Sequence, residues 1–392
     1  MNKSWEYKKI GDVCVVERGG SPRPIDKFIT DDEDGINWIK IGDTSDSMYI
    51  TETAQRIIPE GMKKSRYVKP GDFLLSNSMS FGRPYILKID GCIHDGWLVL
   101  RDEKELFDKR FLYYYLSSKT TYEKFKSMAV GGVVNNLNSE MVRNVSVPVP
   151  SKEEQAEIAD LLDRLKVVLD RRKQELQLLD NLIKARFVEL FGIPIDNTKN
   201  WPMDKAVNLC TLVTDGSHFS PKACDEGYPM LSVKDMRQNG FDYSDCKLVD
   251  DETFEILKKQ GCVPQVDDVL IAKDGSYFTR AFAITEYKEQ AILSSIGMYR
   301  PDIDRILPRF LASYLMTNEV IEFVNRGYVT GTALRRVIIK GLKNIPVYMP
   351  PLELQKEFVQ FAEQVDKSKV AVQNALDETQ LLFDSLMQQY FG

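Results

Sequence analysis

The sequence contains one pattern twice, in a fixed register. Residues 150–192 begin P-S-K-E-E-Q-A-E-I and residues 350–392 begin P-P-L-E-L-Q-K-E-F, both end F-G, and the offset is 200 residues throughout. Earlier in the chain, at an offset of 196, the matching pairs are Trp5 and Trp201, Cys14 and Cys210, Gly20 and Gly216, and Ser21 and Ser217. A twofold repeat whose helical parts keep their length while the globular parts drift predicts one scaffold that holds two different binding domains a fixed distance apart.

The repeat divides the chain into a globule (1–150), a long helix (151–192), a second globule (193–350) and a second long helix (351–392). With 392 residues, of which 43% are hydrophobic and 28% charged, the chain is long enough for two domains of roughly 150 residues. Neither a signal-peptide core nor an apolar run of bilayer length is evident, so we expect a cytoplasmic protein with no membrane contact.

The first helix has a defined start and an apolar stripe. Ser151 precedes Glu154 by three residues, which predicts a capping box, and Gly192 followed by Pro194 predicts the helix end. A heptad seam is formed by Leu162, Leu169, Leu176, Ile183 and Leu190, beside Ile158, Leu165 and Leu179, with Arg172 and Arg186 as interruptions. Such spacing favours a partner helix.

The second helix is less regular. Its apolar face is formed by Phe358, Val365, Val372, Leu376, Phe383, Leu386 and Tyr390, and Lys369 and Thr379 interrupt it. About forty residues at 1.5 Å each give a rod of about 60 Å, too long for one globule to cover. We therefore expect the two rods to pack on each other; the alternative is two amphipathic helices that each lie on their own domain.

Both globules alternate short strands with turns. In the first, V-C-V-V, I-N-W-I-K-I, D-F-L-L, P-Y-I-L and W-L-V-L predict strands and F-L-Y-Y-Y-L predicts a helix. The second has L-C-T-L, P-M-L-S-V, D-V-L-I, A-F-A-I and the helical F-L-A-S-Y-L. The fold class is therefore mixed α/β, an α+β domain built twice around a pseudo-twofold repeat.

Three loops lie at matching points of the two copies and differ in composition. They are G-G-S-P-R-P (19–24) against D-G-S-H-F-S-P (215–221), S-N-S-M-S-F-G-R (76–83) against A-K-D-G-S-Y-F-T-R (272–280), and G-G-V-V-N-N (131–136) against G-T-A-L-R-R (331–336). Glycine allows close approach of a ligand, and the hydroxyl, amide and guanidinium groups suit phosphates or base edges. A solvated turn is the alternative for any one loop.

The net charge of −6 gives no basic excess of the kind that nucleic-acid binders usually carry. However, residues 151–192 hold eight Lys/Arg against nine Asp/Glu, and 351–392 hold three against seven, so the helices account for five of the six net negative charges. Near-neutral globules can still present basic loops. Six cysteines without a C-x-x-C pair and only two histidines, His94 and His218, make a zinc site improbable, and buried thiols explain Cys14 and Cys210.

Motifs of catalysis are absent from the sequence. A methyltransferase needs a glycine-rich cofactor loop and an Asn/Asp-Pro-Pro-aromatic motif, and an ATPase needs G-x-x-x-x-G-K-S/T. Neither occurs, and no E-x-K follows Pro301-Asp302 to complete a nuclease motif. The acidic clusters at Asp31–Asp34 and Asp250–Glu252 are more typical of solvated loops than of a magnesium site. We expect no catalysis and no metal or cofactor.

The whole chain resembles the specificity subunits of Type I restriction-modification systems. The resemblance rests on the duplicated order, on T-D-G-S-H-F-S-P at 214–221, on G-T-A-L-R-R followed by L-K-N-I-P-V within 331–347, and on P-x-x-E-x-Q at each long helix. Leu354 stands where the first copy has Glu154, which leaves the second capping box in doubt. The resemblance implies that each globule is a target recognition domain and that the helices form an antiparallel coiled coil.

The resemblance further implies the partners and the target. The partners would be double-stranded DNA, two methyltransferase subunits, and restriction (nuclease) subunits that join through the complex; S-adenosylmethionine, ATP and magnesium would belong to those subunits. Each globule would read one half of a split sequence. The candidate DNA contacts are Ser21, Arg23, Asn77, Ser80, Arg83, Asn135 and Asn136 in the first copy, and Ser217, His218, Lys222, Lys273, Tyr277, Arg280, Thr332, Arg335 and Arg336 in the second.

Side-chain chemistry suggests how the two halves differ. Arginine fits guanine in the major groove and asparagine fits adenine. Because Arg335 and Arg336 replace Asn135 and Asn136 in register, the second half-site is expected to have a guanine contact where the first has adenine or none. Phosphate binding is the competing role of this arginine pair, and it is the role we expect for Arg23, Lys222 and Lys234.

Two other functions are compatible with parts of the sequence. One is a single-chain DNA methyltransferase or nuclease, which would be active without partners. The other is a coiled-coil scaffold whose globules bind proteins, which would give no motif-dependent protection of DNA. The target sequence and its spacer are not encoded in any motif.

Overall fold

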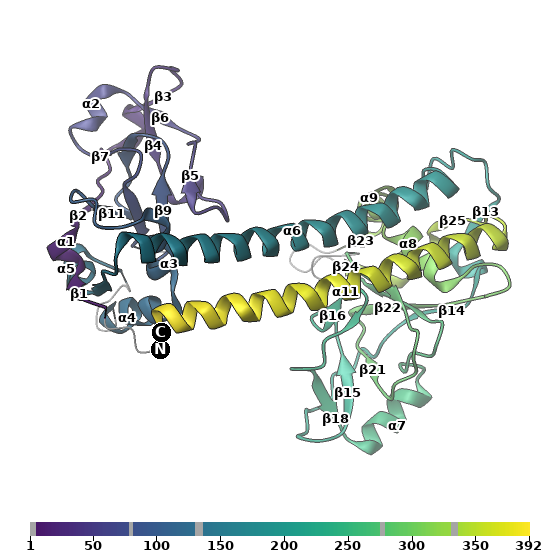
Figure 1. Ribbon diagram of the computed structural model, residues 1–392. Coiled ribbons are helices and arrows are strands. Elements are labelled where there is room, and N and C mark those ends of the chain that lie inside the picture. The colour runs from purple at the N-terminus through teal and green to yellow at the C-terminus, as the bar shows by residue number, and fades with distance from the viewer. Residues whose placement is uncertain (1–4, 78–80, 130–135, 275–278, 331–335) are drawn as a thin grey trace. The chain divides into compact units, whose positions relative to one another are not determined.

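The computed structural model describes residues 5–77, 81–129, 136–274, 279–330 and 336–392. The chain forms two compact units, one of Met1–Lys173 with Asn374–Gly392 and the other of Gln174–Gln373. We call these unit 1 and unit 2. The long helices α6 (Lys152–Phe191) and α11 (Leu352–Phe391) each begin in one unit and end in the other (Figure 1). Each unit therefore consists of a globule, the first half of the helix that follows it, and the last half of the other helix.

Unit 1 is built on two five-stranded sheets. The sheet orders are β2-β11-β8-β9-β5 and β3-β6-β4-β10-β7, and β1 pairs with β12. The strands are β1 (Tyr7–Lys9), β2 (Val15–Arg18), β3 (Ile29–Thr30), β4 (Ile36–Ile39), β5 (Tyr49–Ile50), β6 (Arg56–Ile57), β7 (Arg66–Val68), β8 (Phe73–Ser76), β9 (Pro84–Leu87), β10 (Gly91–Ile93), β11 (Trp97–Arg101) and β12 (Ser146–Pro148). The helices besides α6 are α1 (Ile10–Val13), α2 (Pro59–Met62), α3 (Lys109–Ser117), α4 (Lys119–Ala129) and α5 (Ser139–Asn144), with 3-10 turns η1 (Ile25–Lys27) and η2 (Ile41–Asp43).

Unit 2 has the same arrangement, but its two main sheets contain four and three strands. The orders β14-β22-β19-β20 and β18-β15-β21 correspond to the two large sheets of unit 1, and β13-β25 corresponds to β1-β12. Two further pairs are β16-β17 and β23-β24. The strands are β13 (Met203–Lys205), β14 (Cys210–Asp215), β15 (Tyr228–Leu231), β16 (Met236–Arg237), β17 (Gly240–Phe241), β18 (Lys247–Val249), β19 (Val269–Ala272), β20 (Ala281–Ala283), β21 (Ala291–Ile292), β22 (Ile296–Pro301), β23 (Val329–Thr330), β24 (Arg336–Val337) and β25 (Pro346–Tyr348). The helices besides α11 are α7 (Asp251–Lys259), α8 (Pro308–Leu315), α9 (Asn318–Gly327) and α10 (Ile339–Asn344), with the 3-10 turn η3 (Ala206–Asn208).

The mixed α/β class predicted from the sequence is confirmed, and so are most of the elements. Eight of the nine predicted strand segments contain a strand over most of their length, and the predicted helices F-L-Y-Y-Y-L and F-L-A-S-Y-L lie within α3 and α8. The exception is V-C-V-V, because α1 extends to Val13 and β2 starts only at Val15. In β8 and β19 every residue is buried, which accounts for their continuous apolar sequence.

The last halves of the long helices belong to the cores of the units in which they end. Phe187 and Phe191 of α6 pack on Phe310 of α8 at ring-centroid distances of 5.5 and 4.8 Å, within unit 2. Phe391 of α11 packs on Phe111 of α3 at 5.4 Å, within unit 1. The aromatic residues at the two F-G ends therefore anchor each helix to the globule of the other repeat.

A buried glutamine attaches the start of each long helix to its own globule. Gln155 accepts a hydrogen bond from the Asp108 amide (2.7 Å) and donates to the carbonyls of Leu106 (3.1 Å) and Pro150 (3.0 Å). Gln355 makes the equivalent bonds with the Leu307 amide (2.9 Å) and the carbonyls of Arg305 (3.1 Å) and Pro350 (2.9 Å). Both side chains are fully buried. This explains why P-x-x-x-x-Q occurs at both helix starts.

The cap predicted at the first helix is present in part. The Ser151 hydroxyl accepts a hydrogen bond from the Glu154 amide (3.2 Å), as the capping box requires. The Glu154 carboxylate accepts from the Trp5 indole (3.1 Å). In the second copy, where Leu354 replaces the glutamate, the Pro351 carbonyl accepts from the Leu354 amide (3.0 Å).

The predicted seam residues of both helices are all buried or half-buried. In unit 2, two residues that interrupt the stripe join α6 to α11. Arg186 pairs with Glu357 (2.6 Å), and Lys369 pairs with Asp180 (2.6 Å). These two interruptions of the apolar pattern thus form ion pairs between the helices.

Burial also raises the pKa of two free thiols, Cys14 and Cys210, which lie at matching points of the two copies. Desolvation raises the pKa of Cys14 to about 12, and it does the same for Cys210. All six cysteines are free. In the described parts of the chain, no helix combines the length and the apolar character needed to cross a membrane.

We predict that Gln355→Ala and Gln155→Ala each destabilise their unit by about 2–4 kcal/mol, because a buried amide and two carbonyls lose their partner. Gln177→Ala, at an exposed position of α6, is the matched control and should change stability by less than about 0.5 kcal/mol. Denaturant unfolding of the full chain measures the midpoints. Equal midpoints for Gln355→Ala and Gln177→Ala would contradict the proposed attachment.

Candidate nucleic-acid interface

In unit 1 the three loops that the sequence singled out meet around Asn77. The Asn77 amide donates to the Gly96 carbonyl (3.0 Å), and its side chain donates to the Asp95 carbonyl (2.9 Å). Its own carbonyl accepts from the Leu137 amide (3.0 Å), which follows the third loop. Asn77 is only 1% exposed. This residue therefore connects the second loop to the third and to the segment that receives the first.

Asp95 is the point at which the first loop is attached. Its carboxylate accepts from the Ser21 hydroxyl (2.8 Å), pairs with Arg23 (3.4 Å) and lies 3.0 Å from Nε2 of His94. Burial raises the pKa of Asp95, but the Ser21 hydroxyl and the charges of His94 and Arg23 outweigh burial and lower it below its ordinary value. The carboxylate is therefore ionised at neutral pH and holds the loop through charge.

Unit 2 has the same main-chain frame around Lys273. The Lys273 amide donates to the Ser295 carbonyl (3.0 Å), and its carbonyl accepts from the Val337 amide (2.9 Å), next to the third loop. The Lys273 side chain is 2% exposed, and its ammonium group pairs with Asp215 at 3.0 Å, which ties the second loop to the first. Asn77 and Lys273 thus occupy the same place with different chemistry.

The other predicted contacts of unit 2 lie around this frame. His218 is 69% exposed and its Nε2 lies 3.3 Å from Asp215, whereas Ser217 is buried and its hydroxyl donates to the Phe219 carbonyl (2.9 Å). Arg336 pairs with Asp274 (2.7 Å), and Lys222 is exposed. The guanidinium of Arg280 donates to the Met236 carbonyl (2.8 Å).

In unit 1, Arg83 lies over the ring of Tyr85 and pairs with Asp46 (3.5 Å), and Asn136 is exposed. Five predicted contacts lie outside the described residues: Ser80, Asn135, Tyr277, Thr332 and Arg335. The described residues of each loop set therefore divide into buried ones that hold the frame and exposed ones at its surface.

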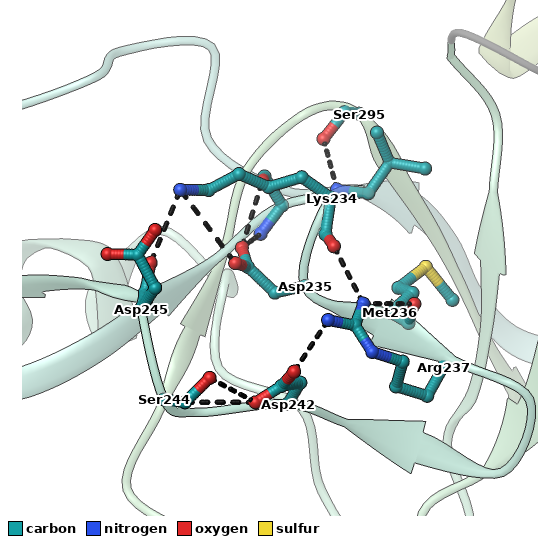
Figure 2. Close-up of polar contacts among 10 residues, drawn as sticks. Lys234, Asp235, Met236, Arg237, Asp242, Ser244, Asp245 and Ser295 are labelled. Atoms are coloured by element: carbon teal, nitrogen blue, oxygen red, sulfur yellow. Dashed lines mark hydrogen bonds and ion pairs between the residues drawn. The ribbon is translucent and has the colours of Figure 1, made fainter. Parts of the chain in front are cut away.

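Lys234, an expected phosphate contact whose polar contacts are drawn in Figure 2, has a side chain that is 63% exposed. Its ammonium donates to the Asp245 carbonyl (3.3 Å) and lies 3.9 Å from Asp235. These contacts leave most of the side chain at the surface.

Sequence reasoning missed the two aspartates that organise the loops. Asp215 is the first residue of D-G-S-H and could have been found from its place beside the glycine, but Asp95 lies in no motif and at no matching point of the second copy. Among the described residues, no cluster of three or more His, Cys, Asp or Glu side chains could hold a metal ion.

Comparison with known proteins assigns this architecture. The family model described as "Type I restriction modification DNA specificity domain" matches residues 2–180 and again 209–379. The chain belongs to this family. Each match covers most of one copy of the repeat, and each copy contains one of the two loop frames described above.

Relatives that match the chain over its whole length are specificity subunits. The EcoKI specificity subunit of Escherichia coli K12 is 21% identical, and the StySPI specificity subunit of Salmonella potsdam is 20% identical; each alignment covers 100% of this chain and 89% of the relative. A solved structure concerned with complex assembly and conformational transition of the Type I system has a TM-score of 0.60 at 18% identity, covering 100% of this chain and 98% of that one. The crystal structure of the S subunit from M. genitalium gives 0.54 at 15%, covering 100% and 97%.

The protein is thus a Type I specificity subunit, the non-catalytic component that recognises the DNA target, and the comparisons support this function over the single-chain enzyme and the protein-binding scaffold. Specificity subunits of Type I systems bind DNA and assemble with other subunits.

We predict that Lys273→Met destabilises unit 2 by about 3 kcal/mol, because it leaves Asp215 without its buried counter-ion. The double variant Asp215→Asn with Lys273→Met should recover part of this loss, since no charge then stays unpaired. Lys234→Met, which removes an exposed lysine, is the control and should cost less than about 1 kcal/mol. Denaturant midpoints measure all three; equal effects of Lys273→Met and Lys234→Met would refute the structural role of the pair.

Proposed function

We propose that each unit reads one half of a bipartite double-stranded DNA target through the surface around its three converging loops. The observation that carries this proposal is the shared frame: Leu137 to Asn77 in unit 1 and Val337 to Lys273 in unit 2. A common backbone frame with different side chains is what two readers of different sequences require. Phosphate contacts then fix each unit on the duplex, and base contacts select the sequence.

The exposed residues of the frame are the proposed contacts. In unit 1 these are Arg23, Arg83 and Asn136, and in unit 2 they are His218, Lys222, Arg280 and Arg336. The buried side chains of Ser217, Asn77 and Lys273 make internal bonds, so their contribution is to hold the loops in the conformation that meets the DNA. Ser80, Asn135, Tyr277, Thr332 and Arg335 remain proposed contacts on the strength of their loops.

The paired long helices are the proposed spacer between the half-sites, as an antiparallel coiled coil. In support, Arg186 and Lys369 form ion pairs between α6 and α11, and the rings of Phe187 and Phe358 lie 5.2 Å apart. A helix of 40 residues is about 60 Å long, which corresponds to nearly two turns of B-DNA.

The assembly follows from the same proposal. Two methyltransferase subunits bind this chain, one for each pseudo-symmetric half, and restriction subunits join through them. S-adenosylmethionine, ATP and magnesium are used by those partners, in the cytoplasm where the DNA is. The near-neutral globules favour an arrangement in which partner subunits supply much of the basic surface and hence of the affinity.

We predict that replacing residues 193–350 with the corresponding globule of another specificity subunit changes only the second half of the methylated motif. The reason is that the loop frame of unit 2 is complete within this range. Mapping of methylated adenines in cells that carry the reconstituted system reads both halves. Replacement of residues 1–150 is the reciprocal control, and a change of both half-motifs, or of neither, would refute the proposal.

We predict that Arg335→Ala with Arg336→Ala relaxes the second half-motif at one guanine, with a loss of about 1–3 kcal/mol of discrimination. If the pair binds phosphate instead, affinity falls for all sequences and the salt slope decreases by about one unit. Motif mapping and binding at several salt concentrations separate these roles. Arg326→Ala, an 80% exposed arginine of α9 paired with Glu322, is the matched control and should leave motif and slope unchanged. The same result for the double variant would exclude both roles.

A further inference from the structure

The two units share one more turn beside the loops, and their chains diverge directly after it. Strands β4 and β15 are equivalent, because each pairs in parallel with the matching strand, β10 or β21. After β4, the Asp43 carboxylate accepts from the Lys40 amide at 2.7 Å. After β15, the Asp235 carboxylate accepts from the Ser232 amide, also at 2.7 Å. The same aspartate-closed turn therefore follows both strands.

Beyond this turn the local structures differ. In unit 1 residues 44–48 are irregular, whereas in unit 2 the chain forms the hairpin β16-β17, with Met236 paired to Phe241 and Arg237 paired to Gly240. Gln238 and Asn239 form the tip of this hairpin. The two units therefore share the turn and differ in the segment that follows it. The three loops show the same pattern, because a shared main-chain frame holds different side chains.

Equivalent arginines attach the divergent segments to the second loop. Arg83, at the end of that loop in unit 1, donates to the Ser45 carbonyl at 3.3 Å. Arg280, at the end of the same loop in unit 2, donates to the Met236 carbonyl at 2.8 Å. The hairpin of unit 2 is therefore held beside the candidate DNA-binding surface.

Polar contacts brace the base of the hairpin (Figure 2). The guanidinium of Arg237 donates to the Asp242 carboxylate (2.6 Å) and to the Lys234 carbonyl (2.9 Å). The side chain and the amide of Ser244, followed by Arg237, lower the pKa of Asp242 to about 2. Asp242 in turn donates its amide to the Asp235 carbonyl (2.8 Å), which connects the hairpin to the shared turn. These bonds attach the base of the hairpin to the shared turn, and they occupy the guanidinium of Arg237.

The tip itself is open. Gln238 and Asn239 are exposed, and the described residues offer their amide groups no hydrogen-bond partner. The tip borders a cleft of about 620 Å³ within unit 2 that is also lined by Lys184, Arg280 and Arg309. Of these cations, Lys184 and Arg280 form no ion pair with any described carboxylate. The two exposed amides and these two cations are groups that can bond base edges and phosphates.

We propose that the hairpin β16-β17 is a fourth specificity element of unit 2, in which Gln238 and Asn239 contact base edges of the second half-site. A two-stranded ribbon fits the major groove, and Asn and Gln side chains bond N6 and N7 of adenine. The irregular segment after Asp43 takes the corresponding place in unit 1. This inference rests on the proposed function, since it assumes that unit 2 reads DNA.

The test uses the full chain in the reconstituted methyltransferase complex. Gln238→Ala and Asn239→Ala are expected to relax the second half-motif at one or two adenine-containing base pairs, with a loss of discrimination of about 5- to 150-fold per contact. Gln238→Glu is expected to move the preference at its position towards cytosine, because a carboxylate accepts from N4 of that base. The first half-motif should stay the same in every variant.

Gln260→Ala, at an exposed position after α7, is the matched control and should leave both half-motifs and the methylation rate unchanged. An unchanged motif in all tip variants would overturn the inference. So would loss of complex assembly with the motif retained, which would identify the tip as a contact with a partner subunit. A wild-type complex that methylates no bipartite motif would instead overturn the proposed function, and the inference with it.

Discussion

The buried amides of Gln155 and Gln355 are the constraint on which the architecture of each repeat depends. Each amide uses its acceptor and both donors on main-chain groups of the globule or of the segment that enters the helix. A shift of the helix by one residue would leave these groups buried without partners, which costs far more than the loss of an exposed hydrogen bond. The direction in which each long helix leaves its globule is therefore fixed by a specific polar contact and not by apolar packing alone.

This constraint distinguishes the scaffold that the two repeats share from the surface in which they differ. The frame around Asn77 and Lys273 shows that the side chain at one position can differ in charge and size while the main-chain hydrogen bonds are kept. Asn77 satisfies its side chain with a carbonyl, whereas Lys273 needs a counter-ion and finds it in Asp215. Because main-chain bonds define the frame, a change of one side chain requires compensation only at its local partner. Loops can thus diverge without loss of the fold.

Much of this architecture could be predicted from the sequence because it is local or repeated. The strand and helix periodicities, the helix starts and the matching loops all follow from patterns within short segments. The packing of Phe191 and Phe391 in the unit formed mainly by the other repeat could not, because an aromatic residue on an apolar stripe has the same signature whether it faces a helix or a globule. The ion pairs of Lys273 and Arg336 could not be predicted either, because their partners lie at least 50 residues away in the sequence. The hairpin after Asp235 was also missed, because its short turn has no glycine at the tip.

The aspartates beside the loop arginines bear on how two near-neutral globules select a site on DNA. Arg23, Arg83 and Arg336 lie 3.4, 3.5 and 2.7 Å from carboxylates of Asp95, Asp46 and Asp274. Exposed pairs of this kind contribute little to stability, so their exchange for another acceptor costs little. At a distance, however, each carboxylate cancels the attraction of its arginine for phosphate, which weakens sequence-independent binding. Only a base edge or phosphate at the correct position can replace the aspartate. The pairs thereby make DNA binding depend more on the position of the acceptor than on the net charge of the loop.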